Sequence, residues 1–307
     1  MSRALIPIAT LLILAAAVGA AAQEKGTLIP QPLPPLANAA DPKIPAKELF
    51  ARKPEPAHLA ARAIGNYVRG CLAGAVALPI NGQTWQVMRL SRNRNWGHPN
   101  LIRFLERLAD EAPKVAGWTG LLVGDIAQPR GGPMLTGHTS HQIGLDADIW
   151  LTPMPDHRLS AEEREEMSAV RVVAADRKDV DPKVWTPGHV AVIRAAARDP
   201  LVERIFVNAA IKKALCRAPG TDRAWLHKVR PWWNHDYHFH VRIRCPSDNP
   251  DCHGQPPAPA DDGCGKELDW WFTDAVLHPK PEPPGPPKPP VKIADLPPAC
   301  RQVLMAP

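Results

Sequence analysis

Proline is the residue that most restricts how this chain can fold. The sequence has 37 prolines among 307 residues, about twice the usual share, and they gather towards the two ends. Residues 279–290 contain little else, which excludes a helix there because each ring removes a donor and clashes with the preceding turn. We therefore expect a folded domain over residues 61–278, between a Pro-rich arm at residues 23–60 and a Pro-rich tail at residues 279–307.

Residues 1–22 have the pattern of a signal peptide. Arg3 supplies the positive charge, Leu5–Val18 is almost wholly apolar, and small residues from Gly19 to Ala22 follow. A membrane anchor is the alternative, but the run falls short of the roughly 20 residues that a span requires. We therefore predict export, with cleavage before Gln23 and no membrane span after the signal is removed.

The cysteines point to disulfides. There are six of them: Cys71, Cys216, Cys245, Cys252, Cys264 and Cys300. In an oxidising compartment an even number favours three bridges. Metal ligation by thiolates is the alternative, but the sequence has no Cys-x-x-Cys pair. The sequence alone does not choose among the pairings, although Cys245 and Cys252 could close a short loop. Cys300 follows the proline run, so we expect the tail to be stapled to the domain.

The charge of the chain is moderately basic. The formal net charge is +6, which could attract an acidic polymer such as cell-wall glycan, a membrane surface or nucleic acid. The basic residues are scattered, however, and the usual nucleic-acid motifs are absent. We expect no nucleic-acid partner.

The pattern between the two ends mixes helices and strands. Residues 101–112 have apolar side chains at helical spacing, with Asn100 as a candidate cap, and residues 190–197 form a second helix after Pro187-Gly188. Strands are expected at residues 118–126, 144–151, 204–208 and 237–245. Since no regular βαβ rhythm appears, we predict an α+β fold. A mainly antiparallel sheet would carry flanking helices, with Pro-rich arms at both ends and disulfides as staples.

A first histidine cluster is His138-Thr-Ser-His141, followed seven residues later by Asp148. Zinc favours imidazole nitrogen and carboxylate oxygen, and a catalytic zinc site keeps an open position beside three protein ligands. A histidine on a loop and an aspartate on the adjoining strand can converge on one ion. Asp146 competes with Asp148 for this role.

A second cluster is His235-Asp-Tyr-His238-Phe-His240. Residues two apart on a strand face the same side, so His238 and His240 share one face while Phe239 packs on the other. This arrangement suits one metal ligand and one partner for the bound water. The aromatic residues beside the cluster are candidates for a peptide groove or for the core: Trp232, Trp233 and Tyr237.

The other histidines and two missing motifs narrow the chemistry. We assign seven histidines to the surface or to satisfied core positions: His58, His98, His157, His189, His227, His253 and His278. The absence of His-Glu-x-x-His excludes the helix-based zincin arrangement, and the absence of Ser-x-x-Lys leaves acyl-serine chemistry without a motif.

Two stretches, Gly137–Asp148 and His235–Pro246, resemble penicillin-insensitive murein endopeptidases. These are periplasmic enzymes of the superfamily of lysostaphin, D-Ala-D-Ala carboxypeptidases and the hedgehog signalling domain. The superfamily pattern is a His and an Asp seven apart, then a distant His-x-His. The similarity extends from about Cys71 to Trp271 and includes Arg204–Asn208, Lys213–Cys216, Lys228–Trp232 and Asp262–Gly265.

The resemblance implies roles for the clustered residues. The ligands of one catalytic zinc would be His141, Asp148 and His240, with His138 a further metal-associated residue. His238 would be the base that faces the water, and His235 would assist it.

The resemblance also bears on a second metal and on the disulfides. The family has a second, weaker metal position on the segment that aligns near Asp176 and Asp179. This chain has Asp179 where we expect a histidine, which puts a second ion in doubt. By analogy the disulfides would be Cys71–Cys300, Cys216–Cys264 and Cys245–Cys252.

The implied activity is zinc-dependent hydrolysis of the D-alanyl–meso-diaminopimelyl cross-link of peptidoglycan in the periplasm, insensitive to penicillin. A D,D-carboxypeptidase of the same superfamily is one alternative, and a non-catalytic zinc-bearing binding module is another. The expected partners are peptidoglycan cross-link peptides. The oligomeric state stays open, with a homodimer among the options.

Overall fold

The computed structural model describes residues 25–218, 220–281, 285–286 and 288–307. The predicted signal peptide, residues 1–22, lies outside this part of the chain, as do residues 282–284 and 287 of the predicted tail. Within the described residues, the structure has no helix that is both long enough and apolar enough to span a bilayer.

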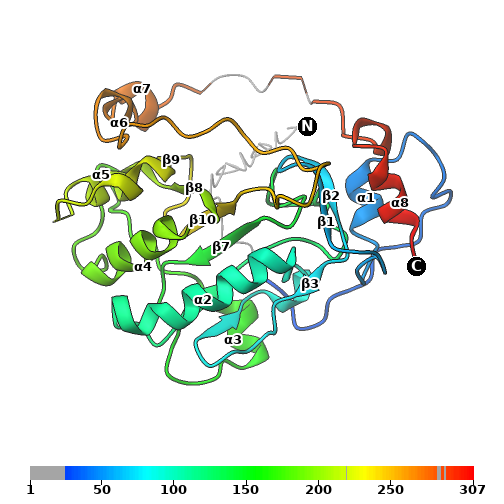
Figure 1. The fold of residues 1–307 in the computed structure, drawn as a ribbon, viewed down its shortest axis with the longest axis horizontal. Coiled ribbons are helices and arrows are strands. Elements are labelled where there is room, and N and C mark those ends of the chain that lie inside the picture. The colour runs from blue at the N-terminus through cyan, green and yellow to red at the C-terminus, as the bar shows by residue number, and fades with distance from the viewer. Residues whose placement is uncertain (1–24, 219, 282–284, 287) are drawn as a thin grey trace, which may run out of the picture.

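A six-stranded sheet forms the centre of the molecule (Figure 1). Its strands, in spatial order, are β4 (Trp85–Val87), β6 (Leu121–Val123), β7 (Asp146–Trp150), β10 (His238–Ile243), β8 (Val202–Val207) and β9 (Val229–Pro231). The three inner pairings are antiparallel, and the two edge pairings, β4 with β6 and β8 with β9, are parallel. Two small antiparallel sheets stand apart: β1 (Arg62–Asn66) with β2 (Arg69–Ala73), and β3 (Val76–Ala77) with β5 (Trp96–Gly97).

Short helices surround the sheets. They are α1 (Ala46–Phe50), α2 (Pro99–Ala116), α3 (Ala161–Glu166), α4 (Pro187–Arg198), α5 (Ala209–Cys216), α6 (Lys266–Trp270), α7 (Asp274–Leu277) and α8 (Ala299–Met305). Figure 1 shows α1 and α8 together at one end of the molecule and α5, α6 and α7 at the other. The prediction of an α+β fold with flanking helices is confirmed.

One face of the central sheet is apolar, and it determines where the polar residues lie. Ile149 of β7 and Phe239 and Val241 of β10 are buried in the same core cluster as Leu105 of α2 and Ile193 of α4. Since side chains alternate along a strand, the residues between them point to the opposite face of the sheet. The histidines and aspartates of β7 and β10 therefore gather away from α2 and α4.

The start of α2 corrects one prediction. The helix begins at Pro99, and its N-cap is His98, whose Nδ1 accepts a hydrogen bond from the Asn100 backbone N–H at 3.2 Å. The prediction of Asn100 as the cap was wrong because proline fits the first helical position, which moves the helix start two residues earlier. Gly117, with φ +67°, ends the helix in the left-handed conformation.

The strand predicted over residues 118–126 is much shorter in the structure. The segment predicted as a strand over residues 118–126 pairs regularly only at Leu121–Val123. After Val123 the pairing with β7 continues irregularly: the Gly124 N–H donates to Asp148 O, and the Asp148 N–H donates to Asp125 O. This turn of the chain carries Asp125 to the polar face of the sheet.

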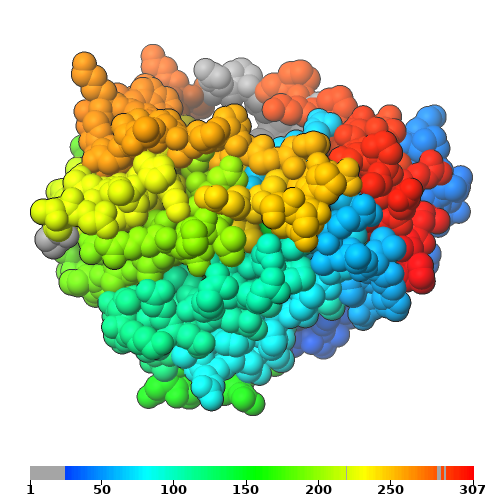
Figure 2. Space-filling view, in the orientation of Figure 1, coloured from blue at the N-terminus to red at the C-terminus, as the bar shows by residue number. Residues whose placement is uncertain are grey.

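The two ends of the described chain pack together. Ala46 and Phe50 of α1 share a core cluster with Cys300 and Val303 of α8, and Figure 2 shows the red C-terminal helix against the blue N-terminal segment. The buried Arg130 side chain donates to the carbonyl oxygens of Val303, Leu304 and Ala306, which satisfies the last turn of α8. The arm is therefore a folded layer and contains a short helix between its prolines.

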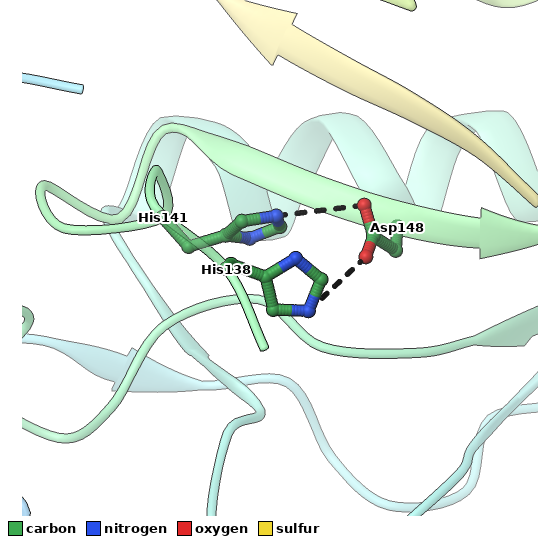
Figure 3. A group of neighbouring side chains, drawn as sticks. All are labelled: His138, His141 and Asp148. Carbon is green, nitrogen blue, oxygen red and sulfur yellow. Dashed lines mark ion pairs between the residues drawn. The ribbon is translucent and has the colours of Figure 1, made fainter. Parts of the chain in front are cut away.

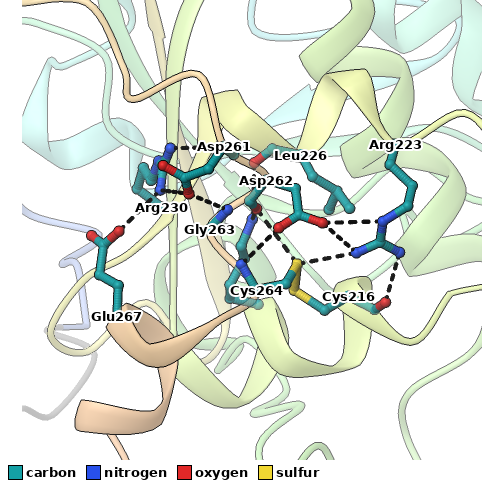
Figure 4. Close-up of a disulfide and its surroundings, with 10 residues drawn as sticks. Cys216, Arg223, Leu226, Arg230, Asp261, Asp262, Gly263, Cys264 and Glu267 are labelled. Carbon is teal, nitrogen blue, oxygen red and sulfur yellow. Dashed lines mark hydrogen bonds and ion pairs between the residues drawn. A yellow bond between two sulfur atoms is a disulfide. The ribbon is translucent and has the colours of Figure 1, made fainter.

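Three disulfides join distant parts of the fold, and they match the pairs that the resemblance implies: Cys71–Cys300, Cys216–Cys264 and Cys245–Cys252. The first ties β2 to α8. The second ties α5 to the loop before α6 (Figure 4).

Next to the second disulfide, the Lys212 ammonium is buried and donates to the carbonyl oxygens of Leu226 and Asp262 at 2.8 and 2.5 Å. Burial lowers the pKa of Lys212 to about 7.

We predict that the Cys71–Cys300 bridge stabilises the fold more than the Cys245–Cys252 bridge. The first bridge joins cysteines 229 residues apart in the sequence, and the second joins cysteines 7 residues apart. In the loop-entropy relation these correspond to roughly 5 and roughly 2 kcal/mol. Double Cys→Ser variants of each pair, compared by urea unfolding, test the order. A larger loss from the Cys245–Cys252 pair would contradict it.

Candidate metal centre

The pairing of β7 with β10 brings the two predicted clusters together. His240 lies opposite Asp148, and His238 lies opposite Trp150, in antiparallel register. All four positions face away from the apolar core, as the alternation requires. Two stretches of chain about 90 residues apart therefore contribute side chains to one buried polar cluster.

His141 enters this cluster from the loop before β7. Its backbone is left-handed, with φ +66°, and its N–H donates to Asp146 Oδ2 at 3.0 Å. Its Nδ1 lies 2.6 Å from the Ile126 carbonyl oxygen, which can only accept, so Nδ1 carries the proton. Burial and the neighbouring His138 lower the pKa of His141. The lone pair of a neutral imidazole is thereby left on Nε2, as a metal ligand requires.

Two imidazole nitrogens approach the same oxygen of Asp148. Its Oδ1 lies 3.2 Å from His240 Nδ1 and 3.4 Å from His141 Nε2. Ligands bound tetrahedrally at zinc distances stand about 3.3 Å apart, so both separations match the edge of a zinc site.

Buried atoms without partners support the same reading. His141 Nε2 and Asp148 Oδ1 are buried and have no hydrogen-bond partner. His238 Nδ1 and His240 Nε2 are also buried without a hydrogen-bond partner, but His240 Nε2 is not the nitrogen that approaches Asp148 and lies 3.3 Å from Asp146 Oδ1. Buried polar atoms are almost always satisfied, so the first two atoms are those that a bound cation would satisfy. The donor set, two imidazoles and a carboxylate, fits zinc.

His138 lies on the outer side of the cluster. His138, His141 and Asp148 each offer one ligand atom, and these atoms lie within 4.8 Å of one another (Figure 3). His138 Nε2 is 3.0 Å from Asp125 Oδ2 and 3.5 Å from Asp148 Oδ2. Burial opposes protonation of His138, but the carboxylates of Asp148 and Asp125 outweigh it and raise its pKa.

The structure separates the roles of the two competing aspartates. Arg242 donates to both carboxylate oxygens of Asp146, from Nε at 2.7 Å and Nη2 at 3.2 Å. Burial would raise the pKa of Asp146, but Arg242 and His240 hold it below its usual range. Asp146 is therefore occupied in fixing Arg242 and the His141 backbone, whereas Asp148 keeps an oxygen available for a cation.

His238 stands at the mouth of the cluster. Its Nε2 lies 3.6 Å from Asp148 Oδ2, and burial lowers its pKa, so the ring is neutral. The rings of His235 and Tyr237 lie 4.8 and 4.5 Å from it. A cavity of about 50 Å³ opens here, lined by Arg89, Arg92, Gly124, Asp125, His138, Asp148, Trp150, Tyr237 and His238. A neutral imidazole beside a small polar cavity can accept a proton from a water held there.

Asp125 was not identified in the sequence analysis, although it belongs to the site. Its Oδ2 accepts from Arg92 at 3.1 Å and from Arg94 at 2.9 Å, in addition to its contact with His138. The signal available was weak: an aspartate that directly follows the buried run Leu121-Leu-Val-Gly. Recognising it requires the knowledge that this strand ends beside β7.

The candidate second metal position lies elsewhere. Asp176 and Asp179 belong to a surface turn that is closed by a bridge between Val173 and Val180. Asp179 accepts from Arg217 Nη2 at 2.7 Å, and Lys213 Nζ lies 3.6 Å away. Neither aspartate is part of the histidine cluster.

The comparisons with known proteins point in one direction. The family model described as penicillin-insensitive murein endopeptidase matches residues 63–305. A protein of that name from Haemophilus influenzae is 51% identical over 230 residues, which cover 73% of this chain and 79% of the relative. Similar proteins of the same name from Yersinia enterocolitica and Escherichia coli are 46% and 43% identical, over 79% and 81% of this chain and 85% and 88% of their own lengths.

We predict that Asp125→Asn destabilises the protein by about 3 kcal/mol, because Arg94 and His138 would lose their buried counter-charge. Asp179→Asn is the matched control, since its ion pair with Arg217 is exposed and should contribute less than about 1 kcal/mol. Urea unfolding of both variants with a chelator present measures the difference. Equal losses in the free energy of unfolding would show that the buried ion pairs of Asp125 stabilise the protein no more than the exposed pair of Asp179.

Proposed function

Because the chain belongs to the penicillin-insensitive murein endopeptidase family, we propose that it is a zinc-dependent enzyme that hydrolyses the D-alanyl–meso-diaminopimelyl cross-link of peptidoglycan in the periplasm. The observation that carries the proposal is that His141 Nε2 and His240 Nδ1 lie 3.4 and 3.2 Å from the same oxygen, Asp148 Oδ1, which is the spacing of neighbouring zinc ligands. Under this proposal residues 1–22 direct export, and the disulfides suit the oxidising compartment.

The proposed zinc ligands are His141, Asp148 and His240, with His138 beside them. When bound there, zinc would supply a Lewis acid for the scissile carbonyl and would lower the pKa of a water molecule. Asp146 fixes the loop of His141 through its backbone N–H, and the Ile126 carbonyl fixes the His141 ring. These contacts orient the ligands in advance, as positioned metal ligands usually require.

His238 is the proposed general base. Its neutral Nε2 accepts the proton of the attacking water as the water oxygen bonds to the carbonyl carbon. The same proton passes to the amine nitrogen as the C–N bond breaks, which returns His238 to its neutral state. A transfer of this kind contributes about 10²–10⁴ in rate. The His235 ring lies beside that of His238 at an interplanar angle of 46° and restricts its position.

Arg92 and Asp125 complete the cavity wall. The Arg92 and Arg94 guanidinium groups compensate the charge of Asp125, which in turn holds His138. The cavity therefore combines a cationic rim with a carboxylate floor. A peptide carboxylate next to the scissile bond could approach this rim without meeting uncompensated negative charge.

We predict that His238→Ala lowers kcat by about 10²–10⁴ and retains about one zinc per chain. Cleavage of a purified cross-linked muropeptide dimer, with zinc content measured on the same sample, tests this. His157→Ala removes an exposed histidine that does not line the cavity and should retain full activity. Unchanged turnover in His238→Ala would remove this residue from the mechanism. Full turnover by the wild type after complete zinc removal would reject the whole proposal.

We predict that Asp148→Ala lowers zinc affinity by more than about 100-fold, whereas Asp179→Ala changes it little. A competition titration against a zinc-binding dye measures both variants. The wild type should bind one ion tightly. A loss of tight binding in Asp179→Ala would show that the turn of Asp176 and Asp179 contributes a ligand after all.

The substrate is tested by comparing two peptides. Preferred cleavage of the cross-linked dimer, unaffected by penicillin, is the expected result. Preferred removal of D-alanine from a free pentapeptide would favour a D,D-carboxypeptidase instead.

A further inference from the structure

A cluster of tryptophans next to the metal centre remains unexplained by the hydrolytic chemistry. Trp232, Trp233 and Trp270 are 53%, 49% and 52% exposed. Trp271 joins them, with its ring centroid 4.8 Å from that of Trp233 and 5.2 Å from that of Trp270. We refer to these four residues as the tryptophan patch. Among the described residues, the other exposed large hydrophobic side chains are aliphatic. Large exposed aromatic patches are uncommon and usually mark interaction surfaces.

The tryptophan patch lies close to the histidines of the metal centre. Phe206 lies between Trp232 and His240, at centroid distances of 5.8 and 5.4 Å. His235, whose ring lies 6.0 Å from that of His240, donates from Nδ1 to the Trp233 carbonyl oxygen at 2.6 Å. One intervening side chain therefore separates Trp232 from the His240 ring.

The part of the patch contributed by α6 is held firmly. The Cys216–Cys264 disulfide anchors the loop that enters α6, and Figure 4 shows this bond among the polar contacts around it. Arg230 Nη1 lies 3.2 Å from Glu267 Oε2 and so ties the first turn of α6 to β9. A rigid platform loses little entropy on binding, which favours a recognition surface over a mobile cover.

The rim of the patch argues against an anionic membrane as its partner. Exposed polar residues flank Trp270 and Trp271 in the sequence: Lys266, Glu267, Asp269, Thr273 and Asp274. Three of these five are acidic, and acidic groups repel anionic lipid. A sugar ring meets both features, because its C–H face stacks on the negative face of indole while its edge hydroxyls donate to carboxylates.

We propose that the tryptophan patch binds the N-acetylhexosamine rings of a glycan strand whose peptide stem occupies the metal centre. This inference rests on the proposed function, since it places the sugar and peptide parts of one substrate on adjoining surfaces. A stem of about four residues spans at most about 14 Å. The ring centroids on the path from His240 through Phe206 to Trp232 are separated by 5.4 and 5.8 Å, which such a stem can span.

The test uses the zinc-loaded protein and compares two substrates that contain the same cross-link. One is the cross-linked peptide dimer without sugar, and the other is the same dimer carrying its disaccharides. We expect Trp270→Ala to lower the ratio of kcat/KM, sugar-bearing over sugar-free, by about tenfold. Trp270→Phe should restore most of the ratio because it keeps an aromatic face. Ile80→Ala, another exposed hydrophobic position, should leave the ratio as in the wild type.

A binding measurement makes the test independent of catalysis. An N-acetylglucosamine tetrasaccharide should quench the tryptophan fluorescence of the wild type saturably, with about tenfold weaker affinity in Trp270→Ala.

Failure of the proposed function would appear as no cleavage of either dimer by the wild type, and the saccharide titration would be unaffected. An unchanged kcat/KM ratio together with unchanged saccharide affinity in both Trp270→Ala and Trp233→Ala would overturn the inference. Concentration-dependent self-association that Trp270→Ala abolishes, with an unchanged ratio, would assign the patch to a second copy of the chain and equally overturn it.

Discussion

The register between β7 and β10 is the constraint on which the site depends. It sets His240 opposite Asp148, and a slip of one residue would turn every side chain of one strand to the other face. The register is fixed from the apolar side, where Ile149, Phe239 and Val241 are fully buried in the core under α2 and α4. The hydrophobic core therefore positions the metal centre from the opposite face of the sheet, and its Ile126 carbonyl also contacts the His141 ring. A core this well packed tolerates changes in volume poorly, so the ligand geometry inherits its rigidity.

Charge compensation explains why so many acidic groups can be buried side by side. Asp125, Asp146 and Asp148 are each almost fully buried, and burial alone would raise the pKa of each. Arginines neutralise the first two, whereas Asp148 faces histidines only. The cluster is thus balanced everywhere except at the point where a cation would bind. Burying an ion pair is seldom stabilising in itself, so an arrangement of this kind is better explained by chemistry than by stability.

The sequence was informative where a pattern was local and strong. The period-two run around His238 and His240 predicted both the strand and the shared face, and the family resemblance implied the disulfide pairs. It was uninformative where the answer depends on tertiary contact. Asn100 is as good a cap as His98 by residue type, and only Pro99 at the first turn decides between them. Asp146 and Asp148 lie on the same face of one strand, and both are suitable ligands by residue type. Only the ion pair of Asp146 with Arg242, nearly 100 residues later in the sequence, distinguishes them. The exposure of Trp232 and Trp233 likewise depends on what α6 leaves uncovered.

The prolines of the two ends acquire a structural meaning in the fold. Segments that cannot complete a sheet or a long helix contribute little core of their own, so the arm and the tail must cover one another. They do so around Phe50 and Val303, with a disulfide and the Arg130 side chain closing the layer. Arg130 belongs to the same chain segment as Gln128 and Gly132, which precedes His138 and His141 and bonds back to Gln142. The layer at one end of the molecule therefore supports, through a short stretch of backbone, the loop that delivers two histidines to the metal centre.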